Sequence, residues 1–172
     1  MPIVRLAQVD EVPKLELVER AAASVFRDVG LAWIAEGELL EATYLIRLCE
    51  QQMLWVAVDD DGAPVGFLAA DWVDGYFHIA EVSVVPSAQK QGIGTALIDA
   101  AVHRANANGF GRVTLTTYRD LPWNGPFYSR LGFVEAGAAI VGPGHVAKLQ
   151  AEAMAGHDPS RRCVMVKVVA DS

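Results

Sequence analysis

The chain has 172 residues, of which 52% are hydrophobic and 20% charged, a composition typical of one folded domain rather than a disordered segment. Its net charge of −7 excludes a broad basic field, so we expect neither nucleic acid nor a membrane surface as a partner. No apolar run could cross a bilayer, no signal peptide is recognisable, and the two cysteines predict no disulfide framework, so we expect one cytoplasmic domain over residues 1–172.

The first half of the chain predicts a strand, two helices and three consecutive strands. Asp60 and Gly62 mark a tight turn between two apolar runs, and Asp74 with Gly75 marks another, so the three strands should form an antiparallel meander. Hydrophobic periodicity places the helices before this meander. The expected elements lie at residues 3–7, 12–26, 38–51, 54–58, 64–72 and 76–85.

The second half alternates helices and strands. A helix is expected first, with Ile93, Ala96, Leu97, Ala100 and Ala101 on one apolar face. The elements expected here lie at residues 92–107, 112–118, 124–131, 133–134, 146–155 and 163–169. Together the two halves predict a mixed α/β (α+β) domain with a largely antiparallel sheet of six to seven strands flanked by helices.

One segment, from Val82 to Thr95, combines a buried strand, a polar loop and a glycine-containing helix start. Gly92 and Gly94 stand in the expected first helical turn, where each loses about 1 kcal/mol of helix propensity against alanine. Without Cβ atoms, the main-chain N–H groups of that turn become accessible to a ligand, and they suit a phosphate. A glycine-tolerant helix start that binds nothing is the plain alternative.

Two other phosphate-binding motifs do not fit this segment. No Gly-Lys-Ser/Thr follows the glycines, which excludes a P-loop. The third glycine of the dinucleotide fingerprint is missing, and the preceding strand belongs to a meander rather than to a βαβ unit.

Two blocks of the sequence resemble the GNAT superfamily of N-acetyltransferases. The first block is Val82-x-Val84-x-Pro86 followed by Gln89-x-x-Gly92-x-Gly94, which resembles the pyrophosphate-binding motif of that superfamily. The second block, Asn124 to Phe133, resembles its second conserved block. One helix and one strand separate the two blocks, and the order of elements from about residue 3 to residue 135 also matches the GNAT layout.

The resemblance implies a GNAT-like acyl-CoA N-acyltransferase fold with acetyl-CoA as co-substrate. The sequence has no His/Cys/Asp/Glu cluster with metal-ligand spacing, so we expect no metal. The resemblance also implies a strand that binds the pantetheine arm, a loop and helix start that hold the pyrophosphate, and two residues of the second block near the cofactor. These cofactor-binding residues are Val82, Ser83, Val84, Gln89, Lys90, Gln91, Gly92, Ile93, Gly94, Thr95, Asn124 and Phe127. GNAT loops often carry arginine where this chain has Gln89 and Gln91, so we expect CoA binding to depend more on the main chain.

Acetyl transfer to an amine requires a base for the amine, stabilisation of the oxyanion and protonation of the leaving thiolate. The resemblance places Tyr128 near the CoA sulfur, where it would assist departure of the thiolate; packing beside Phe127 is the alternative. Glu81 and His78 lie three and six positions before Val84, and both positions hold bases in some GNAT enzymes. We favour Glu81, with a solvated carboxylate as the alternative for Glu81 and a hydrogen-bonded edge residue for His78.

These interpretations predict an N-acetyltransferase that moves the acetyl group of acetyl-CoA directly to a primary amine of a small molecule or peptide. The alternative is a non-catalytic acyl-CoA-binding sensor or interaction module, which keeps residues 89–95 but needs no base. A homodimer through the last strand, residues 163–169, is a further option that the sequence leaves open.

Overall fold

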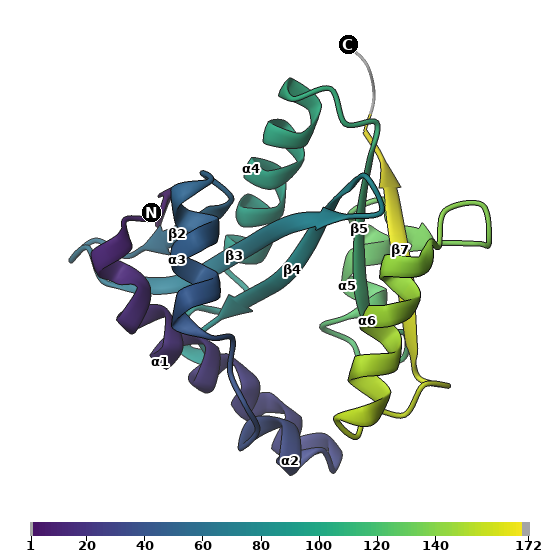
Figure 1. Cartoon of the computed structure of the whole chain (residues 1–172). Helices are drawn as coiled ribbons and strands as arrows, with labels where there is room; N and C mark the ends of the chain where they lie inside the picture. Colours follow the sequence, from purple (N-terminus) through teal and green to yellow (C-terminus); the bar gives the residue numbers. More distant parts are fainter. Residues whose placement is uncertain (1, 170–172) are drawn as a thin grey trace. The chain divides into compact units, whose positions relative to one another are not determined.

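The computed structural model describes residues 2–169, which contain a seven-stranded sheet and flanking helices (Figure 1). The strands are β1 (Ile3–Leu6), β2 (Leu54–Val58), β3 (Pro64–Val73), β4 (Tyr76–Val84), β5 (Arg112–Tyr118), β6 (Val134–Glu135) and β7 (Arg162–Val168). Their hydrogen-bonded order is β1-β2-β3-β4-β5-β7-β6. The β4–β5 pair is parallel, whereas β1–β2, β2–β3, β5–β7 and β6–β7 are antiparallel, so the expected mixed, largely antiparallel sheet is confirmed.

The described helices follow the predicted order with some shifted boundaries. They are α1 (Val12–Ala23), α2 (Ala32–Ala35), α3 (Ala42–Glu50), α4 (Ile93–Ala107), α5 (Gly125–Arg130) and α6 (Pro143–Met154), with short 3-10 turns at Val9–Glu11, Ser24–Val29 and Pro86–Ala88. None of these helices is both long and apolar enough to cross a bilayer.

The chain forms two compact units, which interleave in sequence. The first unit contains residues 1–70 and 81–101, and the second contains residues 71–80 and 102–172. Strands β3 and β4 each contribute residues to both units. The expectation of a single domain stays a prediction.

In the first unit, β2 is the core strand, because all five of its residues are buried between antiparallel neighbours β1 and β3. Helices α1 and α3 contact each other, and α3 contacts β2. Leu15 and Val18 of α1 and Leu45 and Leu48 of α3 are buried, as expected for the apolar faces of two amphipathic helices on a sheet.

Helix α3 begins at Ala42, later than the predicted start near residue 38. The preceding backbone is held in place by α1 instead: the Glu19 carboxylate accepts a hydrogen bond from the N–H of Leu40 at 3.1 Å. Arg20 donates to the carbonyls of Ala35 and Gly37 at 2.9 and 2.8 Å. These hydrogen bonds hold the backbone before Ala42 against α1.

In the second unit, α6 is bound to one face of β5 by polar side chains. Strand alternation puts Thr114, Thr116 and Tyr118 on the same face. Thr114 Oγ1 lies 3.1 Å from Nε2 of His145, Thr116 Oγ1 donates to Glu152 at 2.7 Å, and the Tyr118 hydroxyl bonds His157 just beyond the helix. The three side chains on this face of β5 therefore bond residues that lie along α6 and just beyond its end.

Helix α6 begins at Pro143, three residues earlier than the predicted residue 146. The Asp74 carboxylate accepts hydrogen bonds from the N–H groups of Gly144 and His145 at 2.8 and 2.9 Å, and so caps the first turn. Asp74 lies in the β3–β4 turn, about seventy positions away in sequence. A cap from so far away leaves no local sequence signal; the local signal that the prediction missed is Pro143 at the first helical position.

The other face of β5 carries Val113, Leu115 and Thr117, with Lys167, Met165 and Cys163 as their partners on β7. Helix α5 lies on this face, because Lys167 Nζ donates to the carbonyl of Leu131 at the end of α5. The two faces of β5 are thus covered by different helices, α6 and α5.

The apolar face of α4 differs in detail from the prediction. Ile93, Leu97 and Ala101 are buried as expected, but Ala96 is exposed and Ile98 is buried. Because Ala96 and Ile98 are both apolar, hydrophobic periodicity alone did not identify which of the two lies on the buried face of α4.

Candidate functional site

The segment that joins β4 to α4 makes a tight turn that depends on glycine. The N–H of Val85 donates to the carbonyl of Val65 at 2.9 Å and ties the end of β4 to β3. After one 3-10 turn, the backbone passes through positive φ at Lys90 (63°) and Gly92 (79°). Positive φ is strained for most residues but not for glycine, which gives Gly92 a physical role in this turn.

The first turn of α4 has main-chain N–H groups that the helix itself does not use. The N–H of Ala96 donates to the carbonyl of Gly92 at 2.9 Å and is the first N–H that the helix pairs, so the N–H groups of residues 93–95 precede the first helical donor. A Cβ atom built on Gly92 would meet no atom within 4 Å. Unpaired N–H groups, open space and the positive end of a 15-residue helix together fit a diphosphate such as that of CoA.

The predicted loop residues differ in what their side chains do. Gln89, Lys90 and Gln91 are exposed, and Gln89 Nε2 donates to the carbonyl of Val84 at 3.2 Å, which holds the loop against the end of β4. Ile93 is 4% exposed, so its side chain belongs to the core and only its main chain is suited to a ligand. Gly94 and Thr95 are half-buried.

A glycine that the sequence analysis missed brings β3 close to the predicted cofactor strand. A Cβ atom on Gly66 would lie 3.0 Å from the Ser83 carbonyl oxygen and 3.3 Å from side-chain carbons of Val84 and Ile93. These distances are shorter than ordinary van der Waals contact, so Gly66 sets the spacing between β3, the end of β4 and the start of α4. The available signal was a glycine inside a strand pattern, which often marks a close approach of backbones.

Strand β4 pairs with β5 only near its beginning. The parallel register runs from Phe77 and Val113 to Ile79 and Leu115, and β4 then continues to Val84. Val82 and Val84 are half-buried and Ser83 is 4% exposed. The main chain beyond the last pair is the part predicted to bind pantetheine, and that contact stays a prediction.

The two candidate bases occupy different environments. Glu81 is half-buried, and its carboxylate accepts a hydrogen bond from the Ser83 hydroxyl at 3.0 Å. His78 is only 1% exposed. An odd separation of three positions puts two side chains on opposite faces of a regular strand.

His78 belongs to a buried polar chain in the second unit. Its Nδ1 lies 2.8 Å from Thr114 Oγ1, and the same hydroxyl lies 3.1 Å from Nε2 of His145. Nδ1 of His145 accepts a hydrogen bond from the N–H of Gly142 and lies 3.0 Å from Asp74. Thr114 and His145 are 0% exposed, so these groups depend on one another for hydrogen bonds.

Burial sets the ionisation of this chain. It lowers the pKa of His78 from 6.5 to about 3, with smaller contributions from Lys148 and His145, while Asp74 acts in the opposite direction. Burial also lowers the pKa of His145, against the attraction of Asp74. Both imidazoles are therefore neutral at neutral pH.

The corner between β5 and α5 holds the second group of predicted residues. A Cβ atom on Gly125 would lie 2.7 Å from the carbonyl oxygen of Arg119, so glycine allows α5 to begin against the end of β5. Tyr128 is 8% exposed, with its ring edge-on to Phe127 and Phe133 at centroid distances of 5.3 and 5.8 Å. Asn124 Nδ2 donates to the Trp123 carbonyl at 3.3 Å, whereas its buried Oδ1 has no partner among the described residues.

The predicted site residues thus fall into both units. The first unit holds Glu81, Val82, Ser83, Val84, Gln89, Lys90, Gln91, Gly92, Ile93, Gly94 and Thr95, and the second holds His78, Asn124, Phe127 and Tyr128.

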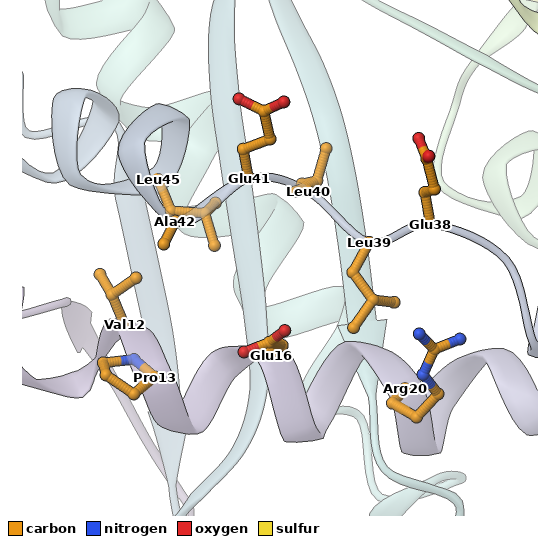
Figure 2. Close-up of a pocket in the computed structure, with 10 residues that line it drawn as sticks. All are labelled: Val12, Pro13, Glu16, Arg20, Glu38, Leu39, Leu40, Glu41, Ala42 and Leu45. Atoms are coloured by element: carbon orange, nitrogen blue, oxygen red, sulfur yellow. The ribbon is translucent and has the colours of Figure 1, made fainter.

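A pocket of about 330 Å³ lies in the first unit, between α1 and the chain that enters α3 (Figure 2). Three carboxylates, Glu16, Glu38 and Glu41, and the guanidinium of Arg20 line it together with apolar side chains. None of the predicted cofactor-binding residues lines this pocket.

Residues 2–169 contain no group of three or more His, Cys, Asp or Glu side chains that could hold a metal ion. Cys49 and Cys163 are free thiols, and burial raises the pKa of Cys163 to about 11, which makes it a poor nucleophile at neutral pH.

Comparison with known proteins identifies the family. Residues 21–133 match the model of the acetyltransferase (GNAT) family. The fold is similar to that of the PaiA N-acetyltransferase from Thermoplasma acidophilum, solved with coenzyme A, at 15% identity and a TM-score of 0.72 over 98% of this chain and 99% of that one.

Two further solved structures share the fold. Naa20 from Chaetomium thermophilum, solved with a bisubstrate analogue, matches at 18% identity and a TM-score of 0.70 over 98% of this chain and 87% of that one. The ribosomal-protein-S18-alanine N-acetyltransferase from Escherichia coli matches at 15% identity and a TM-score of 0.66 over 100% of this chain and 96% of that one.

The buried histidines predict that the protein loses stability between pH 6.5 and pH 5. Folding lowers the pKa of His78 and His145, so in this range the unfolded chain binds protons that the folded chain does not. His78 contributes a slope of up to about 1.4 kcal/mol per pH unit, His145 acts in the same direction, and the stability is fully present only above pH 6.5. Urea unfolding at pH 8, 6.5, 5.5 and 5 measures this slope. His78→Gln should reduce it and His103→Gln, at an exposed position, should not; an unchanged slope in His78→Gln contradicts the prediction.

Proposed function

This chain belongs to the acetyltransferase (GNAT) family, and on that basis we propose that it transfers the acetyl group of acetyl-CoA to a primary amine of a small molecule or peptide. The observation that carries the proposal is the start of α4, where the N–H groups of residues 93–95 lie beyond a glycine turn with open space beside it. A cytoplasmic location and a homodimer through β7 remain predictions.

Main-chain hydrogen bonding accounts for most of the proposed cofactor binding. The turn from Gln89 to Thr95 receives the pyrophosphate of CoA, and Lys90 is an exposed cation within it. The end of β4, residues 82–84, offers main-chain donors and acceptors to the pantetheine arm. Gln89 is engaged with the Val84 carbonyl, so its side chain supports the loop rather than replacing an arginine.

We assign the role of base to Glu81. An alkyl amine has a reference pKa near ~10 and is protonated at neutral pH, so transfer requires a group that takes up its proton, directly or through water. The Glu81 carboxylate is half-buried and held by the Ser83 hydroxyl. His78 is the alternative, but its ring is buried with Nδ1 bonded to Thr114, and its pKa of about 3 makes it a weak base.

We assign Tyr128 to the leaving group. Its ring is fixed between Phe127 and Phe133, which restricts the direction of its hydroxyl. Reference pKa values of about 10 for tyrosine and about 8.5 for a thiol make full proton transfer to the thiolate uphill by ~2 kcal/mol. A hydrogen bond from the hydroxyl to the departing sulfur is therefore the main contribution expected of Tyr128.

A CoA-binding sensor or interaction module without turnover is the second candidate. The same turn at residues 89–95 supports it, because that turn is a binding feature and not a catalytic one. It needs neither Glu81 nor Tyr128, so turnover separates the two functions.

The proposed activity predicts thiol release when the purified protein is mixed with acetyl-CoA and a primary amine. A panel of polyamines, amino acids, aminoglycosides and short peptides with free N-termini covers the amine class, and a thiol reagent measures the CoA released. CoA alone should also raise the melting temperature, since occupancy at 100 times Kd adds about 2.7 kcal/mol to stability. Stabilisation by CoA without turnover on any amine supports the sensor instead, and absence of both overturns the proposal.

Glu81→Gln should remove the acidic limb of the pH–rate profile and lower kcat/KM by about 10²-fold or more, because the amide cannot accept the proton. His78→Gln should leave the position of that limb unchanged. Steady-state rates from pH 5 to pH 9 on the best amine of the panel measure both variants. If the limb survives in both variants, neither residue is the base.

Tyr128→Phe should keep the fold and lower kcat by about 10²-fold, with little change in the KM for acetyl-CoA, since it removes a hydroxyl and retains the ring packing. Phe133→Leu, which changes the other aromatic ring packed on Tyr128, is the control for packing. Full retention of kcat in Tyr128→Phe would leave that residue a packing role alone.

A further inference from the structure

The buried polar chain around Thr114 begins at a group that can only donate. The main-chain N–H of Gly142 donates to Nδ1 of His145 at 3.1 Å. On the other side of the same ring, Nε2 lies 3.1 Å from Thr114 Oγ1, and that hydroxyl lies 2.8 Å from Nδ1 of His78. A main-chain N–H cannot accept a hydrogen bond, so it gives the whole series of bonds a direction.

This direction determines where each proton lies. Nδ1 of His145 accepts from Gly142, so the one proton of this neutral ring is at Nε2, which donates to Thr114. The Thr114 hydroxyl accepts that bond and donates its own hydrogen to Nδ1 of His78. Nδ1 of His78 therefore carries no proton, and the proton of this second ring is at Nε2.

Asp74 is the group that would reverse the direction. Its carboxylate lies 3.0 Å from Nδ1 of His145 and would accept from a proton placed there. However, Asp74 already accepts the main-chain N–H groups of Gly144 and His145, whereas the N–H of Gly142 would lose its acceptor. Hydrogen-bond satisfaction thus favours the direction that begins at Gly142.

Nε2 of His78 is a donor that the described part of the chain does not use. Within residues 2–169, the ring makes its hydrogen bond through Nδ1. The residue is only 1% exposed, but Nε2 is not one of the fully buried atoms that lack a partner, so it belongs to the small exposed part of the ring. The β4–β5 pairing ends at Ile79, one residue after His78, so this N–H lies where the two strands stop pairing.

The electrostatic field at His78 favours an anionic oxygen as the partner of this N–H. Burial is the main cause of the low pKa of His78; after burial, the positive charge of Lys148 lowers the pKa further, and Asp74 raises it by less. Lys148 lies one helical turn after His145 on α6, is half-buried, and makes no ion pair within residues 2–169. A carboxylate beside His78 would be attracted by this charge and would accept a charge-assisted hydrogen bond.

We propose that His78 binds a carboxylate oxygen of the acyl acceptor by donating Nε2–H to it, with Thr114 and His145 as positioning residues. This inference rests on the proposed acetyl-CoA-dependent function. It narrows the acceptor to primary amines that carry a nearby carboxylate, such as amino acids. It also gives His78 a role other than that of the base, because the nitrogen that faces the ligand already holds its proton.

The first test identifies the tautomers directly. A long-range 1H–15N spectrum of the 15N-labelled full chain at neutral pH distinguishes the two ring nitrogens of each histidine, and single His→Gln variants assign the signals. His78 and His145 should both carry the proton at Nε2. Thr114→Val, which keeps the shape of the side chain but removes its hydroxyl, should give His78 a mixture of both tautomers. A proton at Nδ1 of either ring in the wild type reverses the direction, leaves Nε2 of His78 an acceptor and overturns the proposal.

The second test compares an amino acid with its amide as acetyl acceptors, since the amide keeps the amine and the shape but loses the negative charge. His78→Leu removes the N–H and should raise the KM for the amino acid about tenfold or more, the effect of one charge-assisted hydrogen bond, with little change in kcat or in the KM for the amide. His78→Gln retains a donor and should recover much of this loss. Lys148→Met should raise the KM for the amino acid alone, and Lys14→Met, at an exposed position of α1, should change neither KM.

The outcomes separate the carboxylate site from the proposed function. Turnover with equal changes in KM for the amino acid and its amide, in both His78→Leu and Lys148→Met, overturns the site and leaves the acetyltransferase function standing. If His78→Leu does not fold, Lys148→Met and the tautomer spectrum decide. If no amine is acetylated, the proposed function fails, and the response of the His78 Nε2–H signal to added amino acid, but not to its amide, then decides the site by itself.

Discussion

The first turn of a helix must find hydrogen-bond acceptors outside the helix, and this requirement links the sequence motif of this protein to its chemistry. In α4 the turn begins after backbone with positive φ at Lys90 and Gly92, and no atom of the described residues lies within 4 Å of a Cβ built on Gly92. The N–H groups of residues 93–95 are therefore available to an anion. Gly66 supports the same feature, because it lets β3 approach both the end of β4 and Ile93.

Polar contacts, rather than an apolar stripe alone, position α6 on its sheet. Thr114, Thr116 and Tyr118 alternate along β5, and each finds a partner on α6 or just after it. Such contacts are directional, so they fix the helix in one orientation as well as stabilising it. The same geometry engages His78, a candidate base, in a buried chain of hydrogen bonds through Thr114 to His145, whose main-chain N–H donates to Asp74. That environment argues against His78 as the base and leaves Glu81 as the base we propose.

The two faces of β5 differ in how completely their buried polar side chains are hydrogen-bonded. On the α6 face, buried polar side chains are paired, as folding requires. On the α5 face, the Thr117 hydroxyl and the Asn124 Oδ1 atom at the start of α5 have no hydrogen-bond partner among residues 2–169.

The sequence by itself determined the order of elements, the largely antiparallel sheet and the glycine turn before α4, because periodicity, turn residues and helix propensity act over a few neighbouring positions. The family followed from two short motifs for the same reason. Only the tertiary structure decided the start of α6, which Asp74 caps from a distant turn, the close approach at Gly66, and the burial that lowers the pKa of His78. The tertiary structure also decided the hydrogen-bond partners of the β5 threonines. Hydrogen bonding, desolvation and steric contact all depend on residues that come together from distant parts of the chain.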